Sequence, residues 1–327
     1  AVGRAGTLSR IVTIPRNGGA APRTVLSLTM EVNYLDVGPD GRIYADQRDN
    51  PLSLWRFSPE GGHAEKIATI QNSVFGAAAL LPDGGVVVPE SIGGHSRLMV
   101  IEAGKDPRPL AMTQEDTAGP VTTVGSGDVA FLIGQGPQPT IAIATVANGR
   151  ITRRIPFEKG PVGSLASSSD GQTLYVAAGG TIWSMPASAA SGGEARKIRT
   201  GNSAAVDPSG QHLLVQVIET PKSRLFDVPL SGGAEREIPL TGPYHLTFDQ
   251  LNSGSIGRDG RLFVPLASPD NWFFPPGVVD LATGRMTEIA VDHFGDYHFL
   301  LWAPDGRVIA GAYDLRSTLW RFQPDLR

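Results

Sequence analysis

Short apolar runs alternate with glycine-containing turns along the whole chain. Typical runs are Val86-Val87-Val88, Leu213-Leu214-Val215 and Leu262-Phe263-Val264. Each contains a β-branched residue and begins within three residues of a turn glycine. This pattern is typical of strands joined by tight turns, so it predicts an all-β chain built from many short strands.

An Asp-Gly or Ser-Gly turn recurs seven times at steps of 39 to 50 residues. A repeat of this length suits the four strands of a propeller blade. Asp-Gly between two apolar runs also favours a hairpin, because glycine tolerates positive φ. We expect these turns to join the first and second strands of successive blades on one face of a ring. Their glycines are Gly41, Gly84, Gly127, Gly171, Gly210, Gly260 and Gly306, and the aspartates expected in them are Asp40, Asp83, Asp170, Asp259 and Asp305.

A second glycine turn lies between successive copies of the first and is expected to join the third and fourth strands. It follows runs such as Leu54-Trp55-Arg56-Phe57 and Thr181-Ile182-Trp183-Ser184. Because Trp55, Trp183 and Trp320 recur in the third strand, we expect them to be largely buried between blades. The turn glycines are Gly18-Gly19, Gly61-Gly62, Gly104, Gly149, Gly192-Gly193, Gly232-Gly233 and Gly284.

The two series of turns predict a seven-bladed β-propeller with four antiparallel strands per blade, formed by residues 1–327 as one domain. The chain opens with a third-to-fourth-strand turn and closes with a first-to-second-strand turn, so strands from residues 7–28 and 294–327 should share one blade. This arrangement leaves no sheet edge open in the ring. A pair of β-sandwiches with accidental spacing is the alternative fold.

The closure itself has two solutions, because Leu319-Trp320-Arg321-Phe322 copies the third strand Leu54-Trp55-Arg56-Phe57. Two strands from each end could share the blade. We favour three strands from the C-terminal end plus Thr24–Leu28 as the outer strand, with the segment before Pro15 as an extra.

Charge and composition narrow the function classes. The chain has 28 basic and 32 acidic residues without runs of one sign, which leaves no electrostatic footprint for nucleic acid or an anionic membrane. The absence of cysteine excludes thiolate catalysis, disulfides and cysteine-ligated zinc. No apolar stretch is long enough to span a bilayer and the start lacks a signal peptide's apolar core, so we expect a soluble chain. The missing initiator Met suggests an excised fragment or a processed form, so an anchor or another domain could have preceded Ala1.

The repeats resemble those of TolB-like (WD-type) β-propellers over nearly the whole chain. The resemblance is carried by the Asp-Gly turns, by Leu-Trp-Arg in the third strand, and by Gly192-Gly193-Glu194-Ala195-Arg196-Lys197-Ile198 and Gly232-Gly233-Ala234-Glu235-Arg236-Glu237-Ile238. Arrays with such endings are similar to the C-terminal sensor propellers of some bacterial serine/threonine protein kinases. The resemblance implies a non-catalytic sensor or docking region, located extracytoplasmically or in the periplasm and attached to a kinase domain through a membrane span. Kinase motifs themselves are absent from this sequence.

One position at the start of each first strand is Asn, Gly or His throughout. Counting back eight residues from each turn glycine gives Asn33, Gly76, Gly119, Gly163, Asn202, Asn252 and His298. These residue types could serve only the backbone turn into the channel. Alternatively, their polar side chains converge at one channel mouth, where small ligands bind. The second interpretation gives a ligand site, for a small molecule or a protein, of Asn33, Tyr34, Asn202, Tyr244, His245, Asn252, Asp270, Trp272 and His298.

The sixth blade carries two additional segments, residues 242–249 and 268–276, which contain Tyr244, His245, Phe248 and Trp272. Loops carry function more often than scaffold strands, and exposed aromatic side chains usually indicate binding. These rings either overhang the mouth, offer a docking platform, or fold back onto their own blade.

An enzyme of the lactonase or lyase type is the alternative function. It would use a divalent metal such as Ca²⁺ at the channel mouth, and His293, Asp296 and His298 are the candidate ligands because of their spacing. Glu31 and Asp36 fall outside the positions that sugar-lactone lactonases use. Gly94-His95-Ser96-Arg97-Leu98 lacks the second glycine of a nucleophile elbow, and there is no His-Glu-x-x-His. The favoured interpretation has no catalytic residue and no cofactor.

Overall fold

The computed structural model describes residues 2–5, 8–17, 19, 21–28, 32–49, 51–71, 73, 78–92, 94–134, 140–220, 222–314 and 316–323. Regular structure in these residues is almost all strand, and its helical part is one 3₁₀ turn, η1 (Gly192–Glu194). The chain is therefore all-β, as predicted.

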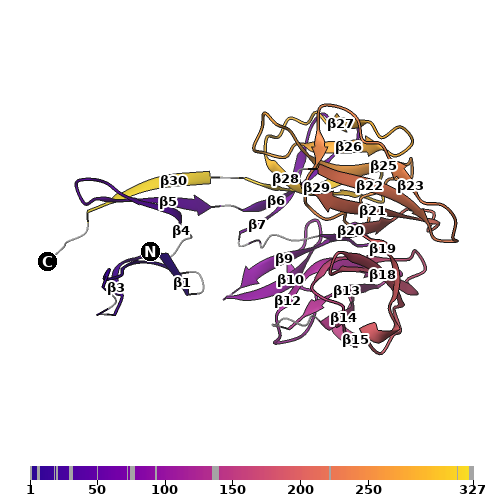
Figure 1. The fold of residues 1–327 in the computed structure, drawn as a ribbon, viewed down its shortest axis with the longest axis horizontal. Helices are drawn as coiled ribbons and strands as arrows, with labels where there is room; N and C mark the ends of the chain where they lie inside the picture. Colours follow the sequence, from indigo (N-terminus) through magenta and orange to yellow (C-terminus); the bar gives the residue numbers. More distant parts are fainter. Residues whose placement is uncertain are drawn as a thin grey trace.

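Six antiparallel sheets of four strands make up most of the molecule (Figure 1). In five of them the strands follow chain order. The first holds β8 (Ala79–Leu80), β9 (Val86–Ile92), β10 (His95–Ile101) and β11 (Arg108–Pro109). The second holds β12 (Thr117–Val124), β13 (Asp128–Ile133), β14 (Thr140–Thr145) and β15 (Arg150–Pro156). The third holds β16 (Val162–Ser167), β17 (Thr173–Ala178), β18 (Thr181–Pro186) and β19 (Arg196–Thr200).

The fourth sheet holds β20 (Ser203–Val206), β21 (His212–Glu219), β22 (Lys222–Pro229) and β23 (Arg236–Ile238). The fifth holds β24 (His245–Leu246), β25 (Arg261–Ala267), β26 (Pro276–Asp280) and β27 (Met286–Glu288). The sixth, here called the composite sheet, holds β28 (Asp296–Trp302), β29 (Val308–Tyr313), β6 (Leu52–Phe57) and β7 (Glu65–Ile70) in that order.

Two sheets of three strands complete the described chain. The outlying sheet has the order β30 (Arg316–Phe322), β5 (Ile43–Asp49), β4 (Val32–Val37). The N-terminal sheet has the order β1 (Val2–Ala5), β2 (Leu8–Thr13), β3 (Arg23–Leu28). Figure 1 shows β5 and β30 running side by side away from the six larger sheets.

The predicted turns between first and second strands have one repeated geometry. In six of them the glycine N–H donates to the carbonyl three residues earlier, as from Gly41 to Gly38 and from Gly306 to Ala303. These six glycines, Gly41, Gly84, Gly171, Gly210, Gly260 and Gly306, have positive φ. The aspartate caps the turn by accepting from the backbone two residues on, as Asp40 does from Arg42 and Asp305 from Arg307. An Asx turn followed by glycine thus starts the hairpin. In the remaining copy, positive φ falls on Gly125 instead of Gly127.

Six clusters of buried side chains hold the six sheets in cyclic order. Each cluster draws on two successive sheets: Phe131 and Leu98 pack in one, Leu174 and Ile141 in the next. The series ends where the composite sheet meets the first sheet, since Leu54 and Phe299 share a cluster with Val88. First strands also contact one another around the ring, as β12 does with β16 and β28 with β8. This packing is that of a β-propeller.

The closure differs from the three-plus-one arrangement that we favoured. The composite sheet takes two strands from each end of the described chain, and Thr24–Leu28 lies in β3, which pairs with β2. The physical reason is that β6 and β30 carry the same Leu-Trp-Arg-Phe motif, and β29 pairs with the first of these copies. The first turn of the series, Asp40-Gly41, consequently lies in the outlying sheet and not in one of the six packed sheets.

The three third-strand tryptophans are less buried than expected. Trp55 and Trp183 are half-buried, and Trp320 is 46 % exposed. Trp183 packs at the edge of a core cluster and donates from its indole nitrogen to the Ala178 carbonyl at 3.3 Å. Trp320 belongs to β30, outside the six packed sheets, which explains its exposure.

Candidate functional site

His298 lies at the start of a ring strand, β28, with a carboxylate on each side of its imidazole. Its Nδ1 is 3.3 Å from Asp249 Oδ2 and its Nε2 is 3.1 Å from Asp296 Oδ2. Asp296 precedes it on the same strand, whereas Asp249 comes from the segment after β24 in the neighbouring sheet. The imidazole therefore ties two neighbouring sheets together.

The two carboxylates determine the charge of His298. Burial alone would lower the pKa of this imidazole, since only 13 % of the side chain is exposed. Hydrogen bonds and charge from Asp249 and Asp296 outweigh burial and raise the pKa of His298 to about 9. At neutral pH the ring is a cation with both N–H groups engaged, and the group of three has a net negative charge.

A tyrosine, a serine and a phenylalanine surround this ion group. The Tyr313 ring lies 5.1 Å from the His298 ring, and its hydroxyl is 3.3 Å from Ser73 Oγ. Burial, together with the charges of Asp249 and Asp296, raises the pKa of Tyr313. Phe274 packs edge-on against His298 at 5.8 Å and donates its backbone N–H to Asp296. Tyr313 therefore remains a neutral hydroxyl that can donate a hydrogen bond.

Two of the predicted asparagines serve the backbone. Asn252 is buried, and its Oδ1 accepts from the Ala78 N–H at 3.1 Å. Asn202 accepts from the Ile218 N–H at 2.8 Å through its own Oδ1. Both side chains therefore bind backbone N–H groups of other segments. The left-handed backbone angles that the backbone interpretation allows are not seen at these two residues, because no described non-glycine residue has positive φ. Gly76, at the same repeat position, lies outside the described residues.

Exposed aromatic side chains stand on the loops next to the ion group. Trp272 is 95 % exposed, and its neighbour Phe273 packs edge-on against Phe294 at 5.1 Å. Phe294, 73 % exposed, and Phe248, 56 % exposed, lie beside Asp296 and Asp249 in the sequence. Exposed aromatic groups of this kind mark binding surfaces. Phe248, Trp272, Phe273 and Phe294 are called the aromatic rim below.

The remaining predicted site residues lie on other strands and turns than His298. Tyr244 donates its hydroxyl to Glu288 on the outer strand β27 at 2.6 Å, and His245 is exposed on β24. Asp270 is exposed in the turn that carries Trp272 and donates its N–H to Ser268. Asn33 and Tyr34 lie on β4 of the outlying sheet, not on a ring strand, because the first repeat is displaced from the six packed sheets.

The three candidate metal ligands separate into two groups. Asp296 and His298 contact each other, but His293 stacks on Trp55 at 3.7 Å and its Nε2 lies 3.2 Å from Asp314. Among the residues that the structure describes, no group of three His, Asp or Glu side chains has a metal-binding arrangement. His293 therefore belongs to a hydrogen-bonded group with Asp314, and desolvation lowers its pKa.

Sequence reasoning missed Asp249, Tyr313 and the rim residues Phe273 and Phe294 as site members. Asp249 and Phe248 stand in the additional segment of the sixth blade, so that insertion was the available signal. Tyr313 gave no signal, because its contact with His298 depends on the pairing of β28 with β29.

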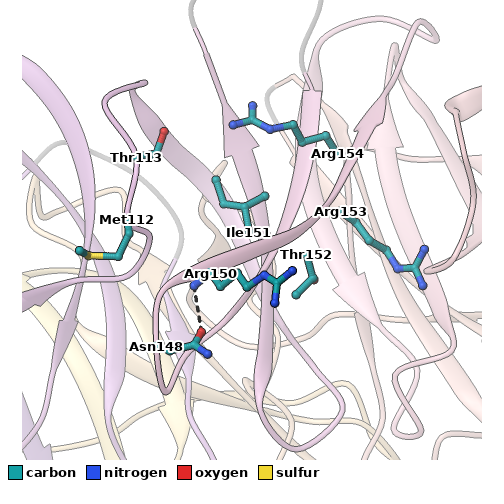
Figure 2. Close-up of a pocket in the computed structure, with 8 residues that line it drawn as sticks. All are labelled: Met112, Thr113, Asn148, Arg150, Ile151, Thr152, Arg153 and Arg154. Carbon is teal, nitrogen blue, oxygen red and sulfur yellow. Dashed lines mark hydrogen bonds between the residues drawn. The ribbon is translucent and has the colours of Figure 1, made fainter.

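A separate basic groove lies on the outer strand β15 (Figure 2). It has a volume of about 600 Å³ and is lined by Met112, Thr113, Asn148 and the run Arg150–Arg154. Arg154 is paired with Glu115, and Asn148 accepts from the Arg150 N–H. Its strand β15 is the outer strand of the sheet, at the opposite edge from the first strand β12, so the groove does not belong to the channel mouth.

Comparisons with known proteins identify the fold. No family model matches the chain, and no curated protein matches it. A solved structure assigned as TolB from Agrobacterium tumefaciens overlaps with a TM-score of 0.60 at 12 % identity, covering 82 % of this chain and 99 % of that one. The chain thus has a TolB-like β-propeller fold, as the repeats predicted.

Two further solved structures share less. TolB from Acinetobacter baumannii has a TM-score of 0.47 at 17 % identity, covering 68 % of this chain and 58 % of that chain. A prolyl endopeptidase has a TM-score of 0.45 at 14 % identity, covering 96 % of this chain and 52 % of that chain. Within the described residues, no helix has the length and apolar character of a membrane span.

Proposed function

We propose that this chain is a non-catalytic binding propeller whose partner, a protein segment, docks on the aromatic rim over the Asp249–His298–Asp296 group. The observation that carries the proposal is the near-complete exposure of Trp272 beside the Phe273–Phe294 ring pair. Large aromatic side chains supply much contact area at low entropic cost, and they dominate binding energy in protein interfaces.

The charge beneath the rim favours a basic group on the partner. Two carboxylates face one imidazolium, and Asp270 adds another exposed carboxylate in the Trp272 turn. A Lys or Arg side chain could lie over an exposed ring while its charge faces these carboxylates. The expected segment therefore presents an apolar side chain next to a basic one.

The site lacks the features of general acid–base or nucleophilic catalysis. Both ring nitrogens of His298 are engaged by carboxylates, so the imidazole cannot accept a proton from a substrate without first losing one of its partners. The role that fits these contacts is to hold the two loops that carry the rim. A binding function is therefore favoured over the lactonase or lyase alternative.

A displayed library of random peptides tests the proposal. We expect wild-type protein to enrich peptides that combine aromatic or aliphatic residues with Lys or Arg. A Trp272→Ser, Phe294→Ser double variant should lose this enrichment. Met112→Ser is the matched control, because Met112 is 80 % exposed in the β15 groove. Equal enrichment by the wild type and the double variant would contradict the proposal.

The repeat resemblance extends the proposal to a cellular role. We infer that the propeller is the sensor or docking part of a bacterial signalling protein such as a serine/threonine kinase, and that it acts outside the cytoplasm. The test is to sequence the gene upstream of the codon for Ala1. A kinase domain followed by an apolar span supports this role, and an unrelated enzyme domain would contradict it.

A further inference from the structure

The composite and outlying sheets each contain a pair of long strands, and the two pairs have the same register. Residues 43–49 pair antiparallel with 316–322, and residues 52–57 pair antiparallel with 308–313, from Ile43 opposite Phe322 to Phe57 opposite Val308. At the junction, Asp49 faces Arg316 and Leu52 faces Tyr313. The Asp314 N–H also donates to the Pro51 carbonyl at 3.2 Å. The pairs on the two sides of the junction therefore share one register.

In other sheets the second and third strands fold back on each other. Ile92 faces His95 at the end of β9 and β10, Ala178 faces Thr181 at the end of β17 and β18, and Glu219 faces Lys222 at the end of β21 and β22. Here, in contrast, the second strand β5 pairs with the third strand β30, and the second strand β29 pairs with the third strand β6. The two hairpins have exchanged their third strands.

The register shows that the exchange can be reversed while every side chain of these strands stays on the same face of its sheet. Trp55 faces Ala310 and Trp320 faces Ala45 in the exchanged ladder. If each hairpin folds on itself with Ala45 opposite Trp55 and Ala310 opposite Trp320, residues 49–51 and 314–316 form the turns. Loops of about three residues are common in hairpins, and each tryptophan still faces an alanine, so inward and outward faces are kept.

The exchanged form leaves apolar surface uncovered on the outlying sheet. Leu319 is 71 % exposed, whereas Leu54, its counterpart in the other copy, is 1 % exposed. Tyr34 and Val37 on β4 are also largely exposed. Surface of this kind favours a form in which a neighbouring sheet covers it.

We propose that the chain has a second closure, in which β6 and β30 change places. One blade is then β4-β5-β6-β7, and the other is β28-β29-β30 with β3 as the outer strand, which gives a seven-bladed ring. We expect β6 and β30 to change places within one molecule. Pro51, which precedes β6, and Asp314, which precedes β30, are already joined by a hydrogen bond, so no second molecule is needed.

This conversion would reach the candidate site directly. Tyr313, whose ring packs on His298, immediately precedes the junction residue Asp314. Asp314 accepts from Ser53 at 2.7 Å and lies 3.2 Å from both Lys66 Nζ and His293 Nε2. Changing places separates β6, with Ser53, and β7, with Lys66, from β29, so the contacts of Asp314 with these two residues are lost when the second closure forms. The exchange is thus a conformational device that reshapes the mouth.

Cysteine pairs distinguish the two closures, since the chain has no native cysteine. Gln47 faces Thr318 in the exchanged ladder, so Q47C/T318C reports that form. Q47C/S53C and A312C/T318C report the second closure, in which these residues would face each other. S91C/S96C is the positive control, because these two serines face each other in the β9–β10 hairpin. Opposed strand residues have the Cα separation that a disulfide requires.

Each variant is oxidised under native conditions, and the disulfides are identified by mass spectrometry of tryptic digests of the monomer fraction. The test pairs give two linked peptides, whereas the control pair lies on the single peptide 67–97 and is identified by its loss of two hydrogens. We expect Q47C/T318C and at least one of the two second-closure pairs, Q47C/S53C or A312C/T318C, to give intrachain links. Adding D314A should increase the yield of the second-closure link, because it removes the contacts of Asp314 with Ser53 and Lys66. Linkage of Q47C/T318C alone, in folded protein that links the control pair, would overturn the proposal. Links formed only between chains would also overturn it and would indicate exchange with a second copy.

Discussion

Leu54 and Leu319 occupy the same position in two copies of one strand motif, yet Leu54 is 1 % exposed and Leu319 is 71 % exposed. Leu54 packs in the cluster that joins the composite sheet to the first sheet. Leu319 lies on the outlying sheet. The location of the strand, and not its sequence, therefore determines how much apolar surface the motif buries.

The first prediction compares these two leucines. Leu54→Ala should lower the free energy of unfolding by about 2–5 kcal/mol, because it leaves a cavity in a packed core. Leu319→Ala should cost about 0.5 kcal/mol or less, as is usual for exposed positions. Urea denaturation of both variants measures the difference. Equal costs would contradict the exchanged pairing as the main form.

The second prediction concerns the charge of His298. Its pKa is raised from 6.5 to about 9 in the folded state, so the stabilisation it supplies is complete below about pH 6.5 and is lost as the pH rises through about 9. The full effect is on the order of 3 kcal/mol. Unfolding free energies measured across this range should fall for wild type relative to His298→Gln.

The exposed histidine His63 provides the control for that experiment. It belongs to another ion pair, with Asp292 at 2.7 Å. His63→Gln should keep the loss of stability towards pH 9, because Asp249, Asp296 and His298 are unchanged in this variant. An NMR titration of the His298 ring gives the pKa directly. A value near 6.5 would show that the two carboxylates do not hold the ring as described.

The third prediction contrasts two turn glycines with similar positive φ. A Cβ on Gly284 would lie 2.0 Å from the Pro239 carbonyl oxygen in the neighbouring sheet, whereas a Cβ on Gly306 would meet nothing within 4 Å. Both Ala substitutions carry a backbone cost of about 1 kcal/mol or more. Gly284→Ala should lower Tm clearly further, because backbone must also move. Equal shifts would contradict the close approach of these sheets.

The fourth prediction concerns the third-strand tryptophans. Trp183→Ala should cost about 2–3 kcal/mol, less than for a fully buried aromatic residue, because the ring is half-buried. Trp320→Ala should cost about 1 kcal/mol or less. Thermal unfolding of the two variants tests this order, and the reverse order would show that β30 is packed inside the ring.

The local elements of the fold could be predicted from the sequence because each depends on nearby residues. Asp40 and Gly41 form their turn through contacts within a few residues, and the same applies at Asp305 and Gly306. The choice between β6 and β30 as the partner of β29 could not be predicted. Both strands carry Leu-Trp-Arg-Phe, so strand propensity and pattern are the same for either pairing.

For the candidate site, too, the residues with a local signal could be predicted from the sequence, and those that depend on strand packing could not. His298 followed from the repeat position and Trp272 from the long loop, because both signals are local. The carboxylate of Asp249 and the ring of Tyr313 meet His298 only through the packing of neighbouring strands. Asn33 was misplaced because the repeat rule assumes that each copy sits in the ring.

Binding by the aromatic rim is the central claim, and calorimetry with one selected peptide tests it most directly. The peptide is taken from the library enriched on wild-type protein and titrated into wild type, Trp272→Ala and Met112→Ala. We expect Trp272→Ala to weaken binding by about 2 kcal/mol or more, roughly 30-fold in Kd, as for an interface hot spot. Met112→Ala should bind like the wild type. Unchanged affinity of a folded Trp272→Ala variant would contradict the account.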